Sequence, residues 1–186
     1  SDIDLPLNFT SFDGLRDSQG HEHYFTSGIA LAHFYRLQGG WAFETIDPVA
    51  SAVSITQLND ELCVAYVSGS ELRIAWGIES NWQIETVSMG LGQPRNPSIA
   101  ISDDGTVWVC ASDSVDGRLW AWDITSASAI GEPLLIDEDG DCGTYTDSIG
   151  LSGNGFQVVY QVGIPYFDMR QAVFNGTTLE VETIRT

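Results

Sequence analysis

The chain has 186 residues, with 26 acidic and 7 basic side chains and a net charge of −19. A chain of this length usually folds as one domain with a sizeable core. Its negative surface repels phosphate groups, which argues against nucleic-acid partners, and no apolar stretch approaches the roughly 18–20 residues that cross a membrane. We expect an extracellular or cell-surface protein, where salt screens the self-repulsion.

The first half of the chain contains two related segments. The segment at about 1–47 has a long, weak hairpin signal, NFTSFDGLRDSQGHEHYF, followed by IALA and WAFETI. The segment at about 48–91 repeats this order more clearly, with AVSITQLNDELCVAY, LRIA and WQIETV. Turn residues between alternating apolar runs are typical of β-hairpins. Each segment therefore predicts four short strands.

The second half repeats the pattern twice more. The segment at about 92–140 reads PSIAISDDGTVWVCA, LWAW and IGEPLLI, where the last strand has lost the Trp and the Glu-Thr pair. The segment at about 141–186 reads DSIGLSGNGFQVVYQ, MRQA and LEVETI. The long interval between WQIETV and LEVETI thus hides one eroded copy of the phrase.

Four-stranded units of about 45 residues are the sequence signature of β-propeller blades. We therefore predict an all-β, β-propeller-type fold of four four-stranded antiparallel blades, at about 1–47, 48–91, 92–140 and 141–186, in one domain over 1–186. The runs LCVAY and VWVCA are apolar on both sides, which predicts strands packed between neighbouring blades. Cys63 and Cys110 lie in these runs and are expected in the core, whereas Cys142 is expected in a loop. The Glu-Thr phrases indicate edge strands, where charge discourages pairing with other chains.

The pattern S-I-A-I-x-D-D-G-x-V-W-V, then L-x-x-A and W-x-x-E-T-V, resembles the repeats of the sialidase-like (BNR-type) propeller group. SDDGTVW at 102–108 is one residue shorter than the S-x-D-x-G-x-T-W box of that group. The resemblance covers the whole chain and implies the propeller fold. Four blades leave three arrangements: a closed four-bladed ring, half of a larger ring made by two chains, or a fragment of a longer protein.

In propellers, ligands usually bind at one end of the central channel, on the loops that enter the innermost strands and on those that join second to third strands. Function concentrates on such loops. Arginine and aspartate offer bidentate hydrogen bonds to a glycan and aromatic rings stack on sugars, although such rings also simply cap the channel. The candidate ligand-binding residues are Arg95, Asp113, Asp116, Arg118, Tyr145, Tyr166 and Phe167.

Two further patterns suggest metal ligands. Asp137, Asp139 and Asp141 alternate in DEDGD, as oxygen ligands of Ca²⁺ often do, but the twelve-residue EF-hand pattern fails and a solvated acidic turn is the alternative. Ca²⁺ is the one cofactor suggested, and none is required. HEHY places His21 and His23 on one side of a strand, which could begin a transition-metal site. No third ligand is identifiable, and a pair of exposed histidines is the alternative.

The sequence contains no recognisable nucleophile with its base, phosphate loop or cofactor fingerprint. It therefore predicts a non-catalytic binding module that recognises a glycan or a protein through loops at one face. One alternative is a glycan-acting hydrolase of the sialidase-like propeller type. Another is a structural set of blades that completes a ring with a second copy or with another chain.

Overall fold

The computed structural model describes residues 9–37, 39–87, 91–126, 129–163 and 167–184. These residues form four antiparallel sheets and contain no helix that could cross a membrane. The first sheet consists of β1 (Ser11–Arg16), β2 (Glu22–Ser27), β3 (Leu31–Leu37) and β4 (Gly40–Asp47). The second consists of β5 (Val53–Leu58), β6 (Glu61–Ser68), β7 (Glu71–Ile78) and β8 (Asn81–Thr86). The third consists of β9 (Pro94–Ile101), β10 (Val107–Asp113), β11 (Leu119–Ser126), β12 (Ala129–Ile130) and β13 (Leu134–Asp137). The fourth consists of β14 (Cys142–Gly150), β15 (Phe156–Val162), β16 (Met169–Phe174) and β17 (Leu179–Ile184).

Each sheet is a meander of sequential antiparallel strands, except that β12 and β13 of the third sheet both pair with β11. The first strands of the sheets contact one another in turn, β1 with β5, β5 with β9, and β9 with β14. They form the inner row, and the phrases WAFETI, WQIETV and LEVETI form the outermost strands β4, β8 and β17. The prediction of an all-β propeller with four antiparallel blades is confirmed.

The outer strand of the third sheet is divided into two short strands. Both β12 and β13 pair with β11, with register irregularities in each pairing. Pro133 lies between them, and Gly131 donates its backbone N–H to the Asp123 carbonyl oxygen over 2.8 Å. The sequence predicts a single strand over 130–136. It is interrupted because proline has no N–H to continue a ladder.

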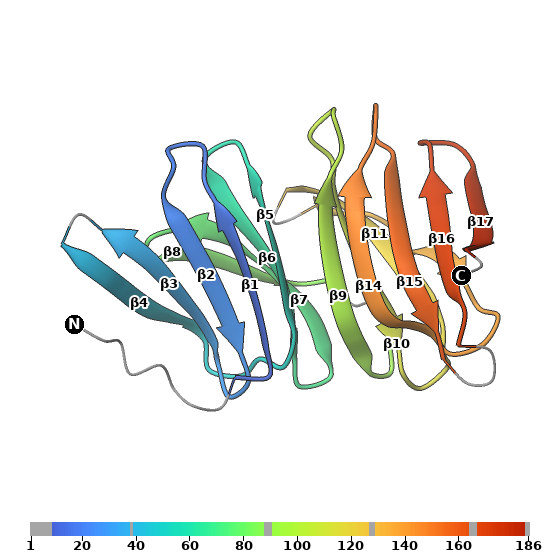
Figure 1. Cartoon of the computed structure of the whole chain (residues 1–186), viewed down its shortest axis with the longest axis horizontal. Coiled ribbons are helices and arrows are strands. Elements are labelled where there is room, and N and C mark those ends of the chain that lie inside the picture. Colours follow the sequence, from blue (N-terminus) through green and yellow to red (C-terminus); the bar gives the residue numbers. More distant parts are fainter. Residues whose placement is uncertain (1–8, 38, 88–90, 127–128, 164–166, 185–186) are drawn as a thin grey trace.

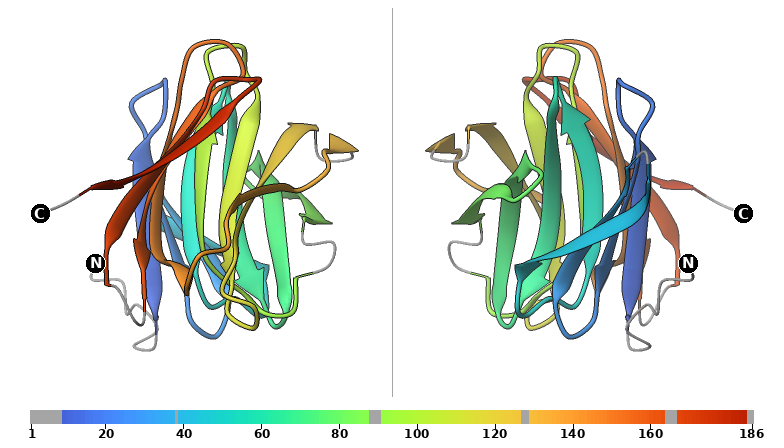
Figure 2. Two further views of the ribbon diagram at one scale, coloured as in Figure 1. Left: turned by 90° about the vertical axis from the view of Figure 1, so that its right-hand side faces the viewer. Right: turned by 90° about the vertical axis from the view of Figure 1, so that its left-hand side faces the viewer.

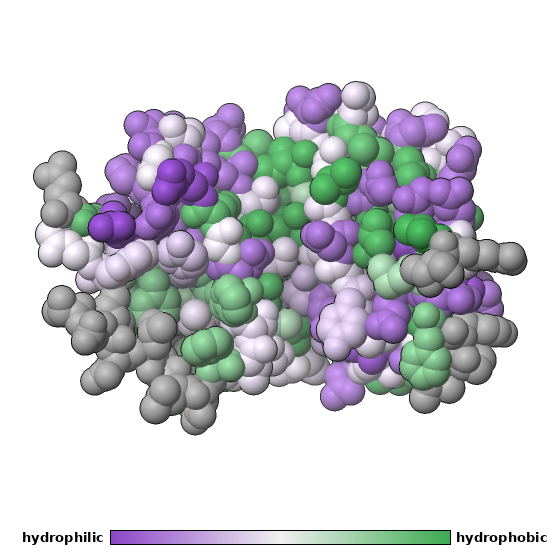
Figure 3. Space-filling model, viewed as in Figure 1, coloured by the Kyte–Doolittle hydropathy of each residue, from purple (hydrophilic) through white to green (hydrophobic). Residues whose placement is uncertain are grey.

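The four sheets form an open arc. The first and fourth sheets lie at opposite ends of the molecule in Figure 1, and Figure 2 views the molecule from each of these ends. The closed four-bladed ring is therefore not formed, which leaves a half-ring or a propeller fragment. The end faces are uncovered, with Phe12 and Phe43 exposed on the first sheet and Ile149 on the fourth. Apolar side chains also gather between the two ends of the arc (Figure 3).

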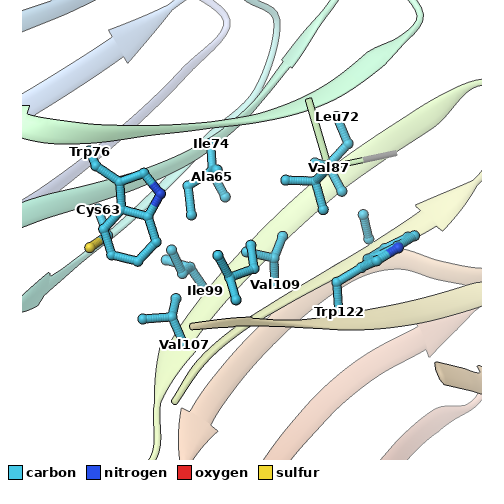
Figure 4. Close-up of a cluster of buried hydrophobic side chains, with 12 residues drawn as sticks. Cys63, Ala65, Leu72, Ile74, Trp76, Val87, Ile99, Val107, Val109 and Trp122 are labelled. Carbon is cyan, nitrogen blue, oxygen red and sulfur yellow. The ribbon is translucent and has the colours of Figure 1, made fainter. Parts of the chain in front are cut away.

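Three apolar cores lie between successive sheets. On β10, Val107 and Val109 pack toward the second sheet, where they meet Trp76 (Figure 4), while Trp108 and Cys110 pack toward the fourth. Successive side chains of a strand point to opposite faces, so a strand between two sheets must be apolar throughout. The prediction for VWVCA and LCVAY is confirmed.

The three cysteines are all free and buried. Cys63 and Cys110 belong to the cores, as predicted. The prediction for Cys142 was wrong, because this residue begins β14 and is fully buried in the core between the third and fourth sheets. Burial, with the Asp137 carboxylate nearby, raises the pKa of the Cys142 thiol to about 12.

Candidate ligand-binding site

The predicted loops meet at one end of the arc, where the third sheet adjoins the fourth. In the β10–β11 loop, Ser114 N donates a hydrogen bond of 2.9 Å to the carbonyl oxygen of Gln93 in the β8–β9 loop. Cys142 N donates to the Gly117 carbonyl oxygen over 2.8 Å, and Gly163 N donates to that of Asp141 over 2.7 Å. Four loops that are far apart in the sequence are thus joined by backbone hydrogen bonds.

Asp113 organises these loops from within. It ends β10 and is buried, and its carboxylate accepts hydrogen bonds from the backbone N–H groups of Gly92 (2.6 Å), Gln93 (3.0 Å) and Val115 (2.9 Å). Burial raises the pKa of Asp113, but these hydrogen bonds and the Arg95 charge lower it more, so the carboxyl group ionises below its usual range. A predicted ligand-binding residue therefore shapes the β8–β9 loop.

Arg95 and Asp141 form an ion pair across the junction, from β9 to the loop before β14. Arg95 Nε also donates to Ser112 Oγ over 3.1 Å. The two paired side chains remain 29% and 42% exposed, so part of each is accessible to a ligand. Beside them, Thr146 Oγ1 donates to the Asn96 carbonyl oxygen over 2.5 Å, which holds β14 against β9.

Asp116 and Arg118 lie at the rim of the same junction. Arg118 Nη1 is 3.3 Å from Asp116 Oδ2, and its Nε is 3.3 Å from Glu138 Oε2. The three side chains are 38% to 60% exposed, and ion pairs this open add little to stability. Gly117 lets the β10–β11 loop lie against the loop before β14, because a Cβ on Gly117 would lie 2.7 Å from the Gly140 carbonyl oxygen.

The predicted aromatic residues do not all join this group. Thr146 contacts the third sheet, so Tyr145, the preceding residue of the alternating strand β14, points to the uncovered face of the fourth sheet. Its side chain is 71% exposed. Phe167 is 65% exposed and has a positive φ of 54°. Tyr166 lies outside the described residues.

The predicted calcium ligands all face arginines. Asp137 Oδ2 accepts hydrogen bonds from Tyr160 OH (2.6 Å) and Arg170 Nη1 (2.8 Å), and Arg170 Nη2 is 3.0 Å from Asp139 Oδ2. Asp141 pairs with Arg95. Burial raises the pKa of Asp137, but these hydrogen bonds and the Arg170 charge lower it more. Calcium binding by the three aspartates stays a prediction.

A second set of the same kind joins the first and second sheets. Asp47 Oδ2 accepts hydrogen bonds from Tyr66 OH and Arg73 Nη1, each over 2.8 Å. Asp47 ends β4, whereas Tyr66 and Arg73 belong to β6 and β7. In both sets an aspartate at the end of one sheet binds a tyrosine and an arginine of the next, so the repeated arginines hold successive sheets together.

The histidines differ from the expectation of an exposed pair. The side chain of His21 is 61% exposed, but that of His23 is only 4% exposed. Asp17, in the β1–β2 turn, supplies a third group that the sequence did not reveal. The sequence also does not single out His33 of β3, which is fully buried, because no motif surrounds it.

The described carboxyl groups whose pKa is clearly shifted do not include one with the raised pKa that a glycosidase acid needs. Five described carboxyl groups have a pKa clearly different from the usual value, and in each it is lowered: Asp17, Glu44, Asp47, Asp113 and Asp137. The general acid of a glycosidase needs a raised pKa to hold its proton near neutrality. All five groups accept hydrogen bonds, and Asp47 and Asp137 also pair with arginines.

Neither a family model nor a curated protein sequence matches the chain. A lectin from Burkholderia pseudomallei matches in structure with a TM-score of 0.69 and 17% identity, over 94% of this chain and 55% of the lectin. A variant of the Aleuria aurantia lectin in complex with Fucα1-6GlcNAc matches with a TM-score of 0.59 and 14% identity, over 95% of this chain and 61% of the lectin. A thermostable family-43 glycoside hydrolase matches with a TM-score of 0.58 and 10% identity, over 95% of this chain and 71% of the hydrolase.

The chain therefore spans about 55% to 61% of the length of these lectins. At such identities the likeness concerns the fold, which is that of a β-propeller. The narrower resemblance to sialidase-like repeats stays a prediction.

Proposed function

We propose that the chain is a non-catalytic β-propeller module that binds a glycan at the junction of its third and fourth sheets. The observation that carries the proposal is the partly exposed Arg95–Asp141 pair, which joins β9 to the loop before β14, where Arg118 pairs with Glu138. Such groups can donate and accept paired hydrogen bonds to sugar hydroxyl groups. The lectins that share the fold support this choice of ligand class.

A fucose-containing glycan is the first probe to use, because the Aleuria aurantia lectin was solved with Fucα1-6GlcNAc. We also propose an extracellular or cell-surface location, where the acidic surface is screened by salt and glycans are accessible. Calorimetric titration with Fucα1-6GlcNAc, preceded by a glycan array to select the best ligand, tests the binding proposal.

Arg95→Met is the variant that tests the site, and Arg16→Met is its matched control. Arg16 is 67% exposed on the first sheet, far from the junction. Losing charge-assisted hydrogen bonds costs about 1.5–3 kcal/mol, so we expect Arg95→Met to weaken binding by about 10- to 100-fold. The control should bind like the wild type. Equal affinity of all three proteins would place the ligand elsewhere.

A glycan-acting hydrolase is the competing function, because a glycoside hydrolase shares the fold. Incubation of the protein with nitrophenyl glycosides, including the fucoside, separates the two functions. Binding without release of nitrophenol supports the module. Release of nitrophenol by the wild type would replace it with the hydrolase.

We further propose that additional blades complete the ring. The end face of the first sheet carries the exposed Phe12 and Phe43, and that of the fourth sheet carries the exposed Ile149. These uncovered apolar faces suit a head-to-tail contact between copies of the chain. Light scattering gives the mass in solution. A dimer supports a second copy, and a monomer assigns the missing blades to another chain or to a longer protein of which this chain is a part.

A further inference from the structure

The turn between β1 and β2 holds one carboxylate rigidly. Asp17 Oδ1 accepts hydrogen bonds from the backbone N–H groups of Gln19 (2.9 Å) and His21 (2.6 Å). Its other oxygen, Oδ2, faces two imidazole rings, 3.0 Å from His21 Nδ1 and 3.3 Å from His23 Nε2. One carboxylate oxygen is thus fixed by the turn, while the second is aimed between two nitrogens.

The 3.3 Å distance between Asp17 Oδ2 and His23 Nε2 equals an edge of a tetrahedral zinc shell, and the 3.0 Å distance to His21 Nδ1 is slightly shorter than one. Zinc binds histidine nitrogen and carboxylate oxygen at about 2.0–2.2 Å, so the ligands of a tetrahedral ion stand about 3.3–3.6 Å apart. The ligating atoms of Asp17, His21 and His23 all lie within 4.8 Å of one another. Within the described ranges, no other three His, Cys, Asp or Glu side chains meet this condition.

A row of hydrogen bonds continues from His23 into the interior of the first sheet. His23 Nδ1 is 2.9 Å from His33 Nε2, and His33 Nδ1 is 2.9 Å from Glu44 Oε1. Glu44 in turn accepts hydrogen bonds from Trp82 Nε1 (3.0 Å) and Ser80 N (2.8 Å). Metal-bound histidines almost always have their other ring nitrogen oriented in this way, which fixes the tautomer and the angle of the ring.

The row of hydrogen bonds is compatible with a metal ion bound to His23 Nε2. Each ring would then carry its proton on Nδ1, so that His23 donates to His33 and His33 donates to Glu44.

The three side chains also line a pocket of about 40 Å³, with Glu79 and Tyr35 on its wall. A space of this size is large enough for a water molecule. A metal held by Asp17, His21 and His23 would therefore keep one position for water or for an oxygen atom of a ligand, as three-ligand zinc sites do.

We propose that Asp17, His21 and His23 form a binding site for a divalent transition metal of the zinc type, oriented by His33 and Glu44 and open to the pocket. Imidazole nitrogen favours Zn²⁺, Ni²⁺ and Cu²⁺ over Ca²⁺ and Mg²⁺, which prefer oxygen. The site lies in the first sheet, so it is independent of the glycan proposal.

The test is calorimetric titration of the metal-stripped full chain with ZnCl₂ at neutral pH in excess Ca²⁺. The Ca²⁺ occupies acidic surface groups that would bind zinc weakly. We expect one Zn²⁺ per chain. His21 is exposed, so His21→Ala should fold normally. Removing a residue that only hydrogen-bonds to a metal ligand lowers metal affinity by about 10- to 100-fold, so removing the ligand His21 should lower it at least as much.

Matched controls separate the site from the acidic surface. Gln19→Ala changes the same turn, and Glu22→Gln removes the carboxylate of a residue that pairs instead with Arg16. Both should bind zinc like the wild type, and Co²⁺ should give the visible absorption of a nitrogen-ligated site that is lost in His21→Ala. No zinc binding by the wild type, or equal binding by His21→Ala, would overturn the proposal. A loss in Glu22→Gln as large as in His21→Ala would do so as well.

Discussion

Arg170→Met should destabilise the fold far more than Arg118→Met, although each change removes one arginine from two acidic partners. Arg170 and Asp137 are only 11% and 8% exposed, whereas Arg118 and its partners are 38% to 60% exposed. Removing one partner of a buried ion pair costs about 3–5 kcal/mol, and an exposed pair contributes about 0.2–1 kcal/mol.

We expect the lower end, about 3 kcal/mol, for Arg170→Met, because Tyr160 OH and Asp139 N still donate to Asp137. For a chain of this size, each kcal/mol lowers Tm by about 2–4 °C, so the decrease should be about 6–12 °C. Arg118→Met should lower Tm by no more than about 4 °C. Urea unfolding followed by tryptophan fluorescence measures both free energies.

The pH dependence gives a second readout. The pKa of Asp137 is lowered in the folded state, so its contribution is present above the unfolded pKa of about 3.9 and is lost as pH falls through the folded pKa. The difference in stability between the wild type and Arg170→Met should therefore stay constant from pH 7 to about pH 4 and shrink as the pH falls further. Equal effects of the two arginine variants, or a difference that does not change with pH, would refute the reasoning.

Four further outcomes are expected. Tyr160→Phe should cost about 1.5–3 kcal/mol in urea unfolding, because it removes a hydrogen bond to an ionised carboxylate. Gly150→Ala should prevent stable folding, since its Cβ would lie 1.6 Å from the Ile101 carbonyl oxygen, whereas Gly39→Ala meets no atom within 4 Å and should keep its Tm. The three buried thiols should resist a thiol reagent at pH 8 until urea is added. If the DEDGD aspartates bind calcium, Ca²⁺ should raise the Tm of the wild type but not of Asp139→Asn, and an unchanged wild-type Tm rejects the idea.

The sequence predicts the repeated parts of this fold well because they obey local rules. The alternation of β10 and the turn residues of each hairpin depend on neighbours in the chain, so the strands could be predicted from them. The break in the outer strand of the third sheet also has a local cause, Pro133, although the run IGEPLLI predicts one strand.

The candidate sites depend on contacts between distant residues, which single-sequence patterns do not reveal. Arg95 meets Asp141 only because β9 lies beside β14. Asp17 has the sequence context of an ordinary turn residue, and its second oxygen reaches His23 only once the hairpin has formed. Tyr145 could be predicted to be exposed, but the face to which it points follows from the contact of Thr146 with the third sheet.

The pairing registers show which arginine should serve a ligand. Tyr66 pairs with Arg73 and Tyr160 with Arg170, so these arginines occupy the same place in two sheets and bind the preceding sheet in the same way. Arg118 lies directly before β11. The second sheet has an acidic residue at the corresponding position, so this arginine is not repeated there. A repeated group serves the repeated packing, whereas a unique exposed group is available for binding. Arg118→Met should therefore lose glycan affinity at nearly unchanged stability, and Arg170→Met should lose stability while its folded fraction binds normally. Titration of both variants at a temperature where each is folded measures this, and a loss of affinity in Arg170→Met alone would contradict the assignment.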